Sequence, residues 1–184
     1  MRRPLFLAAV LLMLDQVTKV LAQALFAERS LYLLPGLRLT YCINPGIWLN
    51  SRLPPAYLTW LQALSAGCML LGGLYLAFYH RFYRRSLLAD MGYASFVAAA
   101  LGNLFLDRWL AGGARDFMGT PWFVFNVADL LSSLSIWLLV LEVLLFGRAR
   151  ERLVPMRTPR EMGRELRFFW RLARHEVWHW RRGQ

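Results

Sequence analysis

The sequence predicts an all-α membrane protein with four transmembrane helices, a small extracytoplasmic β-rich loop region and a C-terminal amphipathic interfacial helix. Hydrophobic residues make up 58% of the 184 residues and charged residues only 18%. The mean hydropathy is +0.37. This composition is too apolar for an ordinary soluble domain. The arginines also gather at the ends of the apolar stretches, as they do in proteins that cross a bilayer.

Four segments approach the roughly 20 consecutive apolar residues that a helix needs to cross a bilayer. We expect these spans at about residues 5–26, 56–79, 87–110 and 122–146. Arginine clusters precede the first span, separate the second from the third and follow the fourth. By the positive-inside rule, both termini and the short middle loop are cytoplasmic. The first segment begins like a secretory signal peptide, but Asp15 and Lys19 interrupt it, so we interpret it as the first span.

This orientation places residues 27–55 and 111–121 outside. The first connection contains LRLTYCI followed by an Asn-Pro-Gly turn signal, which predicts a small sheet on the outer membrane surface. The second connection is rich in glycine and leads into Trp122, Phe123 and Phe125. Because aromatic side chains suit the headgroup level, we expect the fourth helix to begin among them.

Residues 148–184 differ in kind from the membrane domain, which we place at residues 1–147. The tail holds 11 arginines and four acidic residues, so +7 of the total net charge of +11 lies here. Its apolar residues recur at three- and four-residue spacing from Met162 to Trp180, which is typical of a helix lying in the inner membrane interface. We expect the tail to bind anionic lipid headgroups, with a protein partner as the alternative, and we expect no nucleic acid.

Polar side chains interrupt two of the spans. Asp15 and Lys19 are one helical turn apart and can pair on one face. This pair either only fixes helix packing or also shapes a functional site. Asn103 and Asp107 are likewise four residues apart, and with Arg108 they can satisfy one another and clamp the adjoining loop. Because lipid offers these groups no partner, we expect all of them to face protein.

Asp116 lies in the second outer connection, and Asp129 lies seven residues into the predicted fourth helix on the same face as Asn126. A hairpin that folds the loop back over the helix brings the two carboxylates together at the interface. Two carboxylates that close share one proton, so that one acts as a base towards water and the other as an acid towards a carbonyl. We therefore predict a hydrolytic carboxylate pair. Asp90 and Glu142, near the cytoplasmic helix ends, are expected to reach water or nearby arginines.

Five motifs follow one another along the chain: DQVTK at residues 15–19, NPG at 44–46, GNLFLDR at 102–108, Asp-Phe at 116–117 and FNVAD at 125–129. In this order they resemble the lipoprotein signal peptidase (signal peptidase II) family. The resemblance implies a membrane aspartic endopeptidase without metal or cofactor. It cuts the signal peptide from diacylglyceryl-modified prolipoproteins on the amino side of the lipidated cysteine, at the outer face of the bacterial cytoplasmic (inner) membrane.

The resemblance makes Asp116 and Asp129 the catalytic dyad. It also gives supporting or substrate-contacting roles to eight further residues, which are Asp15, Lys19, Asn44, Gly46, Asn103, Asp107, Arg108 and Asn126.

Three features depart from the family pattern. Three residues instead of two separate Asn103 from Asp107, and one extra residue rotates a helix by about 100° unless a π-bulge absorbs it. Trp48 and Leu49 stand where the family has a small residue and a phenylalanine. The interval 116–129 is shorter than usual. These departures leave an alternative open, in which the chain is a non-catalytic signal-peptidase-like subunit or a lipoprotein-binding module of a membrane complex.

Overall fold

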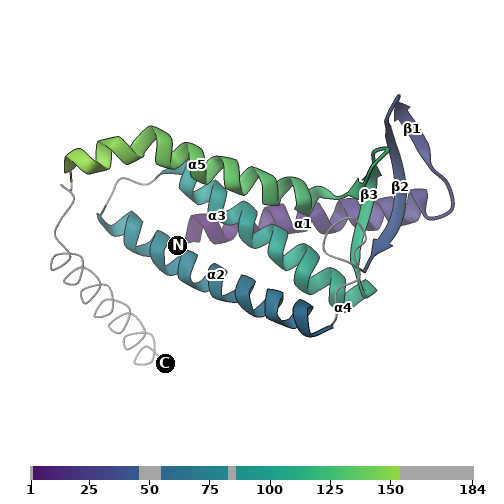
Figure 1. The fold of residues 1–184 in the computed structure, drawn as a ribbon, viewed down its shortest axis with the longest axis horizontal. Coiled ribbons are helices and arrows are strands. Elements are labelled where there is room, and N and C mark those ends of the chain that lie inside the picture. The colour runs from purple at the N-terminus through teal and green to yellow at the C-terminus, as the bar shows by residue number, and fades with distance from the viewer. Residues whose placement is uncertain (1, 46–54, 83–85, 154–184) are drawn as a thin grey trace.

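The computed structural model describes the backbone of residues 2–45, 55–82 and 86–153. Long helices run side by side through most of the molecule, and a small sheet closes one end (Figure 1). The interfacial helix predicted for the tail lies outside the described residues, as do Gly46 and Trp48.

Four helices of the described chain are long and apolar enough to cross a membrane. They are α1 (Arg2–Phe26), α2 (Pro55–Phe82), a continuous rod made of α3 (Leu87–Ala100), η1 (Leu101–Leu106) and α4 (Asp107–Ala111), and α5 (Val127–Leu153). The number of spans agrees with the prediction. Helix α5 continues as far as Leu153, so the expected domain boundary after residue 147 is not a break in the helix.

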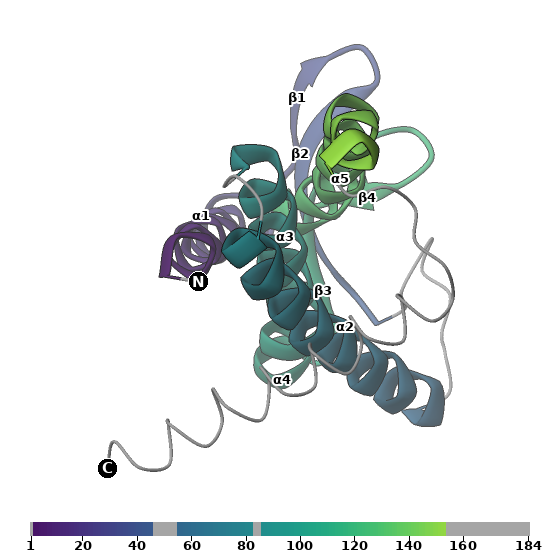
Figure 2. The same ribbon diagram turned by 90° about the vertical axis from the view of Figure 1, so that its left-hand side faces the viewer.

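Helix α3 is the centre of the bundle and lies between α1 and α5 (Figure 2). Its small side chains explain this position, because small residues let helix backbones approach closely in a membrane protein. Ala94, Ser95 and Ala98 are completely buried. In the most apolar stretch of this rod, 56% of the residues are buried. In the corresponding stretches of the other three spans, 22% or fewer are buried. The outer helices therefore direct most of their apolar side chains outward, where a bilayer would cover them.

A π-helical turn absorbs the extra residue between Asn103 and Asp107. The rod changes from α- to π-helix over Leu101–Leu106, and the amide of Asp107 donates to the carbonyl of Gly102, five residues back. It returns to α-helix and ends at Gly112, whose φ of 72° lies in the left-handed region that favours glycine. Because the π-turn takes up one residue, the rotation of about 100° that an insertion imposes on a regular helix does not carry into the segments on either side.

The sheet has four antiparallel strands in the order β1-β2-β3-β4. They are β1 (Leu31–Leu34), β2 (Leu37–Asn44), β3 (Ala114–Gly119) and β4 (Val124–Phe125). The first outer connection supplies β1 and β2, as its sequence predicted. The second connection supplies β3, and residues predicted to begin the fourth span supply β4; the sequence pattern alone suggested neither strand. In the register between the two connections, Cys42 lies opposite Asp116 and Asn44 lies opposite Ala114.

The fourth helix begins at Val127, not near Trp122 as expected. Val124 and Phe125 instead pair with the end of β3, and this pairing keeps the aromatic segment extended. The expected depth of Asp129 is therefore wrong. This residue lies in the first turn of α5, next to the sheet, and not seven residues into the helix.

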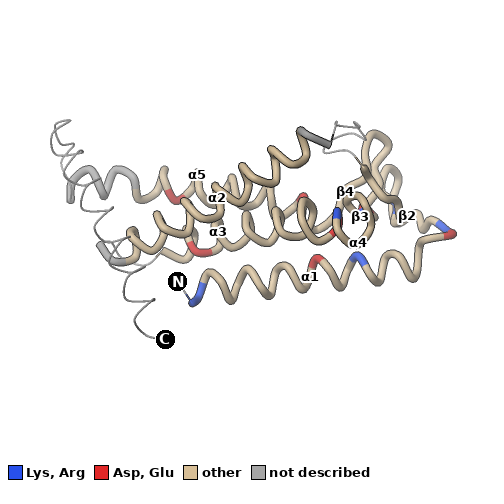
Figure 3. The backbone as a smooth tube through the Cα atoms, turned by 90° about the horizontal axis from the view of Figure 1, so that it is seen from below, with Lys and Arg blue, Asp and Glu red and all other residues tan. Residues whose placement is uncertain are grey.

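Charged residues interrupt the helices at few positions (Figure 3). At the end of the bundle away from the sheet, Asp90 and Glu142 are 1% and 4% exposed, so of the two expected partners, water and nearby arginines, water is excluded, and Asp90 meets an arginine. Asp90 lies 2.9 Å from Nε2 of His80 and 3.9 Å from Nε of Arg3. Glu142 accepts hydrogen bonds from the hydroxyls of Tyr79 and Ser86. These contacts join α1, α2, α3 and α5 at this end.

Replacing Gly113 by alanine should destabilise the protein. A Cβ at this position would lie 2.5 Å from the carbonyl oxygen of Asn44, a backbone atom that cannot move without displacing β2. We expect a loss of about 1–3 kcal/mol in the free energy of unfolding, the usual range for overpacking. The measurement is thermal unfolding of the purified protein in detergent micelles.

Gly67→Ala is the matched control, because a Cβ there meets no atom within 4 Å. This variant should unfold at or slightly above the temperature of the unsubstituted protein, since alanine favours helix over glycine. Equal unfolding temperatures for the two variants would contradict the contact at Gly113.

Candidate active site

The first turn of α5 holds Asp129 in place. Asn126 stands immediately before the helix, and Asp129 is its third residue. The amide of Asp129 donates to Oδ1 of Asn126 at 3.1 Å, and the amide of Asn126 donates to Oδ2 of Asp129 at 3.0 Å. This reciprocal pair is a capping box, which satisfies two amides that would otherwise lack partners at the helix start. The second carboxylate oxygen accepts from Nδ2 of Asn103 at 2.9 Å.

Asp116 comes from β3 and is 2% exposed. Its Oδ1 accepts from Nδ2 of Asn126 at 2.6 Å, and its Oδ2 accepts from Nδ2 of Asn44, the last residue of β2, at 3.1 Å. Burial and, after it, the charge of Asp129 raise the pKa of Asp116 from its ordinary value of 3.8 to about 7. Asp116 therefore holds a proton up to neutral pH.

Asn126 connects the two carboxylates. Its side-chain amide donates to Asp116, and its backbone amide donates to Asp129. The same side chain donates to Oδ1 of Asn103 at 3.0 Å and is completely buried. Both acidic side chains are thus arranged around one asparagine, where the end of β4 meets the start of α5.

Lys19 supports this arrangement from α1. It is completely buried, and its Nζ lies 2.8 Å from Asp15, 2.8 Å from Asp107 and 2.7 Å from Oδ1 of Asn103. Three partners match the three N–H groups of an ammonium. Asp15 also accepts from the backbone amide of Ala128, in the first turn of α5, at 2.9 Å. The predicted pairing of Asp15 with Lys19 is confirmed, but the pair is not self-contained, because it joins α1 to the central rod and to α5.

Arg115 is a part of the site that the sequence analysis missed. Its backbone amide donates to Oδ2 of Asp107 at 3.0 Å, and its Nε and Nη2 donate to Oδ1 at 3.0 and 2.7 Å. Nη2 also donates to the side chain of Gln16 at 2.5 Å. The sequence could have indicated this role of Arg115, because the side chains of successive strand residues point to opposite faces of a sheet. If residues 114–119 had been predicted as a strand, Arg115 would have been placed on the face opposite Asp116. A cation buried on that face would then have needed an acidic partner.

Asn103, Asp107 and Arg108 were expected to bind one another, but each of them has other hydrogen-bond partners. Asp107 accepts from Arg115, and Asn103 donates to Asp129. Arg108 donates from Nη1 to the carbonyl oxygen of Pro45 at 2.5 Å, so it joins the central rod to the residue that follows β2.

A cleft of about 800 Å³ opens beside the carboxylates. Its polar lining includes Asn44, Asn103, Arg108, Asp116, Asp129 and three serines, Ser65, Ser132 and Ser133. Its remaining walls come largely from α2, α3 and α5 and are mostly apolar or small, including Leu61, Phe96, Ala99, Ala100, Leu130 and Ile136. An extended apolar segment with a peptide bond at one end matches this distribution of polar and apolar surface. Within the described residues, no three His, Cys, Asp or Glu side chains are grouped so that they could hold a metal ion.

Comparison with known proteins identifies the family to which this chain belongs. The family model described as signal peptidase (SPase) II matches residues 7–145. This chain belongs to the signal peptidase II family. Members of this family are aspartic proteases of the membrane, so the predicted family and enzyme class are confirmed.

Relatives named lipoprotein signal peptidase support the same assignment. The protein of Syntrophomonas wolfei is 35% identical over 146 residues, which cover 78% of this chain and 93% of that relative. The protein of Staphylococcus carnosus is 34% identical over 159 residues, covering 80% and 93%. That of Yersinia pseudotuberculosis is 30% identical over 147 residues, covering 76% and 85%.

A solved structure of a bacterial membrane enzyme is similar in fold. It matches with a TM-score of 0.60 at 24% identity, covering 78% of this chain and 88% of that chain. The predicted fold of four apolar helices with a small sheet is thereby confirmed for this signal peptidase II.

The raised pKa of Asp116 leads to a prediction about stability and pH. Because its pKa in the folded signal peptidase II is about 7 and its ordinary value is 3.8, the folded chain binds a proton that the unfolded chain has released between these values. The contribution of Asp116 to the free energy of unfolding therefore falls as pH rises from about 4 to about 7, and it does not change further above pH 7. Asp116→Asn removes this titration. The difference between the unfolding temperature of the variant and that of the unsubstituted protein should therefore shift in favour of the variant between pH 5 and pH 8.

Thermal unfolding of both proteins in one detergent, at several pH values, gives this difference directly. Asp90→Asn, which removes a buried carboxyl at the other end of the bundle, is the control for a general effect of losing a buried acid. A difference between Asp116→Asn and the parent that is the same at every pH would contradict the raised pKa.

Proposed function

We propose that this chain is an active lipoprotein signal peptidase. It is a membrane aspartic endopeptidase that cleaves signal peptides from diacylglyceryl-modified prolipoproteins on the amino side of the lipidated cysteine. The observation that carries the proposal is the pair of carboxylates, the buried Asp116 and the partly buried Asp129, held around Asn126 beside a cleft with mostly apolar or small walls. The names of the relatives agree with this substrate.

The two carboxylates supply the general acid and the general base of hydrolysis. Asp116 is the member of the pair that we propose holds the proton, because burial and the charge of Asp129 raise its pKa to about 7, so that a substantial fraction is protonated at neutral pH. Asp129 takes a proton from water as the water oxygen attacks the carbonyl carbon, and Asp116 gives its proton to the carbonyl oxygen. In the second step Asp129 gives its proton to the departing amine as the carbon–nitrogen bond breaks, and Asp116 takes a proton from a hydroxyl of the tetrahedral intermediate, so the dyad again holds one proton.

The remaining polar residues position the dyad and the substrate. Asn44 and Asn126 hold Asp116 by donating to its two oxygens. Asn103 holds Asp129 by donating to one of its carboxylate oxygens, and Lys19 keeps Asn103 in place by donating to its side-chain oxygen. Arg108 faces the same cleft, and a donor there suits a backbone carbonyl of the bound peptide. The apolar walls suit the signal-peptide helix and the acyl chains.

The direction of the chain in the membrane is also a proposal. Both termini lie on the cytoplasmic side of the bacterial inner membrane, and the sheet and dyad lie at the outer leaflet. The arginine clusters support this direction by the positive-inside rule. The sheet and the N-terminus occupy opposite ends of the bundle, as this direction requires (Figure 1).

Asp116→Asn and Asp129→Asn should each lower the processing of a lipid-modified prolipoprotein by about 10³-fold or more, because neither step proceeds without both an acid and a base. The measurement is the conversion of a fluorescent or radiolabelled lipidated substrate by purified protein in lipid micelles. Glu142→Gln is the control, since this buried acid lies several turns along α5 from Asp129, towards the end of the bundle away from the sheet, and should leave processing largely intact.

Two results would contradict the assignment. One is near-normal processing by either dyad variant. The other is an unsubstituted protein that binds the lipidated substrate and never cleaves it, which is the behaviour of the non-catalytic module considered as an alternative.

We further propose that the tail attaches to the inner leaflet through anionic headgroups. Eleven arginines behind the membrane domain support this, since each basic residue near an anionic surface contributes about 1 kcal/mol. A peptide of residues 158–184 should bind vesicles containing phosphatidylglycerol and should be released by salt, as judged by tryptophan fluorescence and sedimentation. Equally strong binding to purely zwitterionic vesicles would show that electrostatic attraction is not the cause.

A further inference from the structure

The π-turn that aligns the two halves of the central rod has a cost in hydrogen bonding. In a π-turn each amide donates to the carbonyl five residues back, as Asp107 does to Gly102. Where the rod returns to the α-helical pattern, in which each amide reaches four residues back, the regular succession of backbone hydrogen bonds is interrupted. In the apolar part of a membrane protein, a backbone carbonyl at such an interruption is stabilised by an additional donor.

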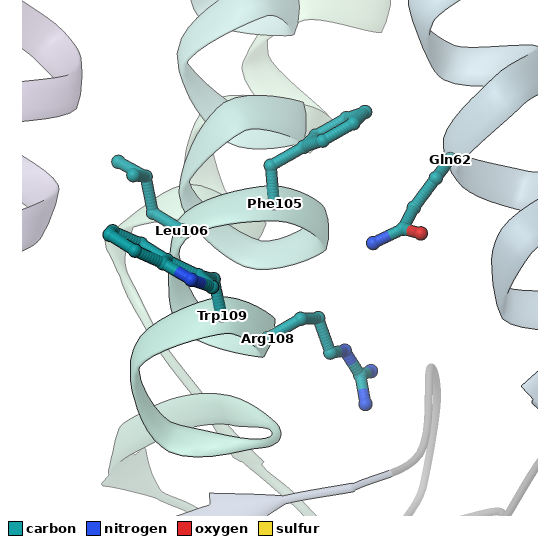
Figure 4. A pocket seen from close by; sticks show the side chains of 5 residues that line it. All are labelled: Gln62, Phe105, Leu106, Arg108 and Trp109. Carbon is teal, nitrogen blue, oxygen red and sulfur yellow. The ribbon is translucent and has the colours of Figure 1, made fainter.

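Gln62 of α2 supplies a donor to this turn. Its Nε2 donates to the carbonyl oxygen of Leu104, in the middle of η1, at 2.6 Å. Figure 4 shows Gln62 reaching from α2 towards the turn of the rod that carries Phe105 and Arg108. The five side chains in this view line a cavity of about 470 Å³ between the two helices.

The hydrogen bond lies one residue from the dyad's own contacts. Asn103 precedes Leu104 and donates to Asp129 at 2.9 Å. The backbone of this turn therefore connects Gln62 directly to a donor of the proposed dyad. Asp107, which ends the turn, is held separately by Lys19 and Arg115. A shift of the Leu104 peptide would accordingly move Asn103 first.

We propose that Gln62 is a positioning residue that stabilises the π-turn by binding the Leu104 carbonyl and so sets the position of Asn103 against Asp129. The expected effect of Gln62 on the rate of cleavage rests on the proposed function. Its expected effect on the π-turn does not, because that effect concerns the folded chain alone. Gln62 acts at the turn and not on substrate. Its loss is expected to reduce the rate of cleavage more than substrate binding.

A double-mutant cycle tests this proposal. Gln62→Met removes the donor while keeping the length of the side chain. Deletion of Phe105 leaves two residues between Asn103 and Asp107, so that the turn can be regular α-helix. In the full-length chain with its native turn, Gln62→Met should lower kcat about tenfold, within the range expected when a part-buried carbonyl loses a donor, and change KM less than about twofold.

In the chain that lacks Phe105, activity should remain within about threefold of the parent, and Gln62→Met should then have little further effect on kcat. Leu64→Met, on the exposed surface of α2, is the matched control for substitution on this helix and should be neutral in both backgrounds. The unfolding temperature, measured without substrate, should follow the same pattern, with Gln62→Met destabilising only the chain that contains the π-turn.

The two readouts separate this inference from the proposed function. A parent chain that does not process prolipoprotein contradicts the proposed function, and the unfolding temperatures still decide the role of Gln62. Equal losses from Gln62→Met in both backgrounds, in kcat or in unfolding temperature, would overturn the inference. An increase in KM with unchanged kcat would overturn it as well, because it would make Gln62 a substrate contact.

Discussion

The structure depends on one constraint, which is that charges enclosed within a four-helix membrane bundle must neutralise one another. Lys19 meets this constraint by contacting Asp15 and Asp107, while Arg115 supplies a second cation to Asp107. All three acid–base partners on α1 and the central rod are completely buried, where an unpaired charge would cost several kcal/mol. Two carboxylates and two cations balance, so the contacts that join α1, the rod and the sheet carry no net charge.

In the part of the chain that the structure describes, the other two carboxylates form no salt bridge. Asp116 and Asp129 receive hydrogen bonds mainly from the asparagines Asn44, Asn103 and Asn126, which stabilise charge less than a cation would. A carboxylate pair in such surroundings favours retention of one proton. The neutral support network and the shared proton of the proposed dyad are thus consequences of the same distribution of buried charge, and acid–base hydrolysis by that dyad would require this protonation state.

The π-turn shows how the chain accommodates a change within this constraint. An extra residue between Asn103 and Asp107 would rotate either the amide or the carboxylate away from its partners if the helix stayed regular. Both side chains nevertheless remain in the network, since Asn103 meets Lys19 and Asp129 and Asp107 meets Lys19 and Arg115. The departure that suggested a non-catalytic module is therefore absorbed locally, and the contacts of the dyad are kept.

Sequence alone determined the four apolar spans, the sheet in the first outer connection, the pairing of Asp15 with Lys19 and the family, because these depend on composition, local spacing and the order of short motifs. It did not determine which partners Asp107 and Arg115 take, or that the second outer connection forms strands. It also misplaced the start of α5 and so the depth of Asp129. Those features depend on contacts between residues far apart in the chain. Hydrophobicity along the sequence cannot reveal that β4 pairs with β3, or that a cation beside Asp116 lies against a carboxylate eight residues earlier; only the packing of the helices against the sheet decides them.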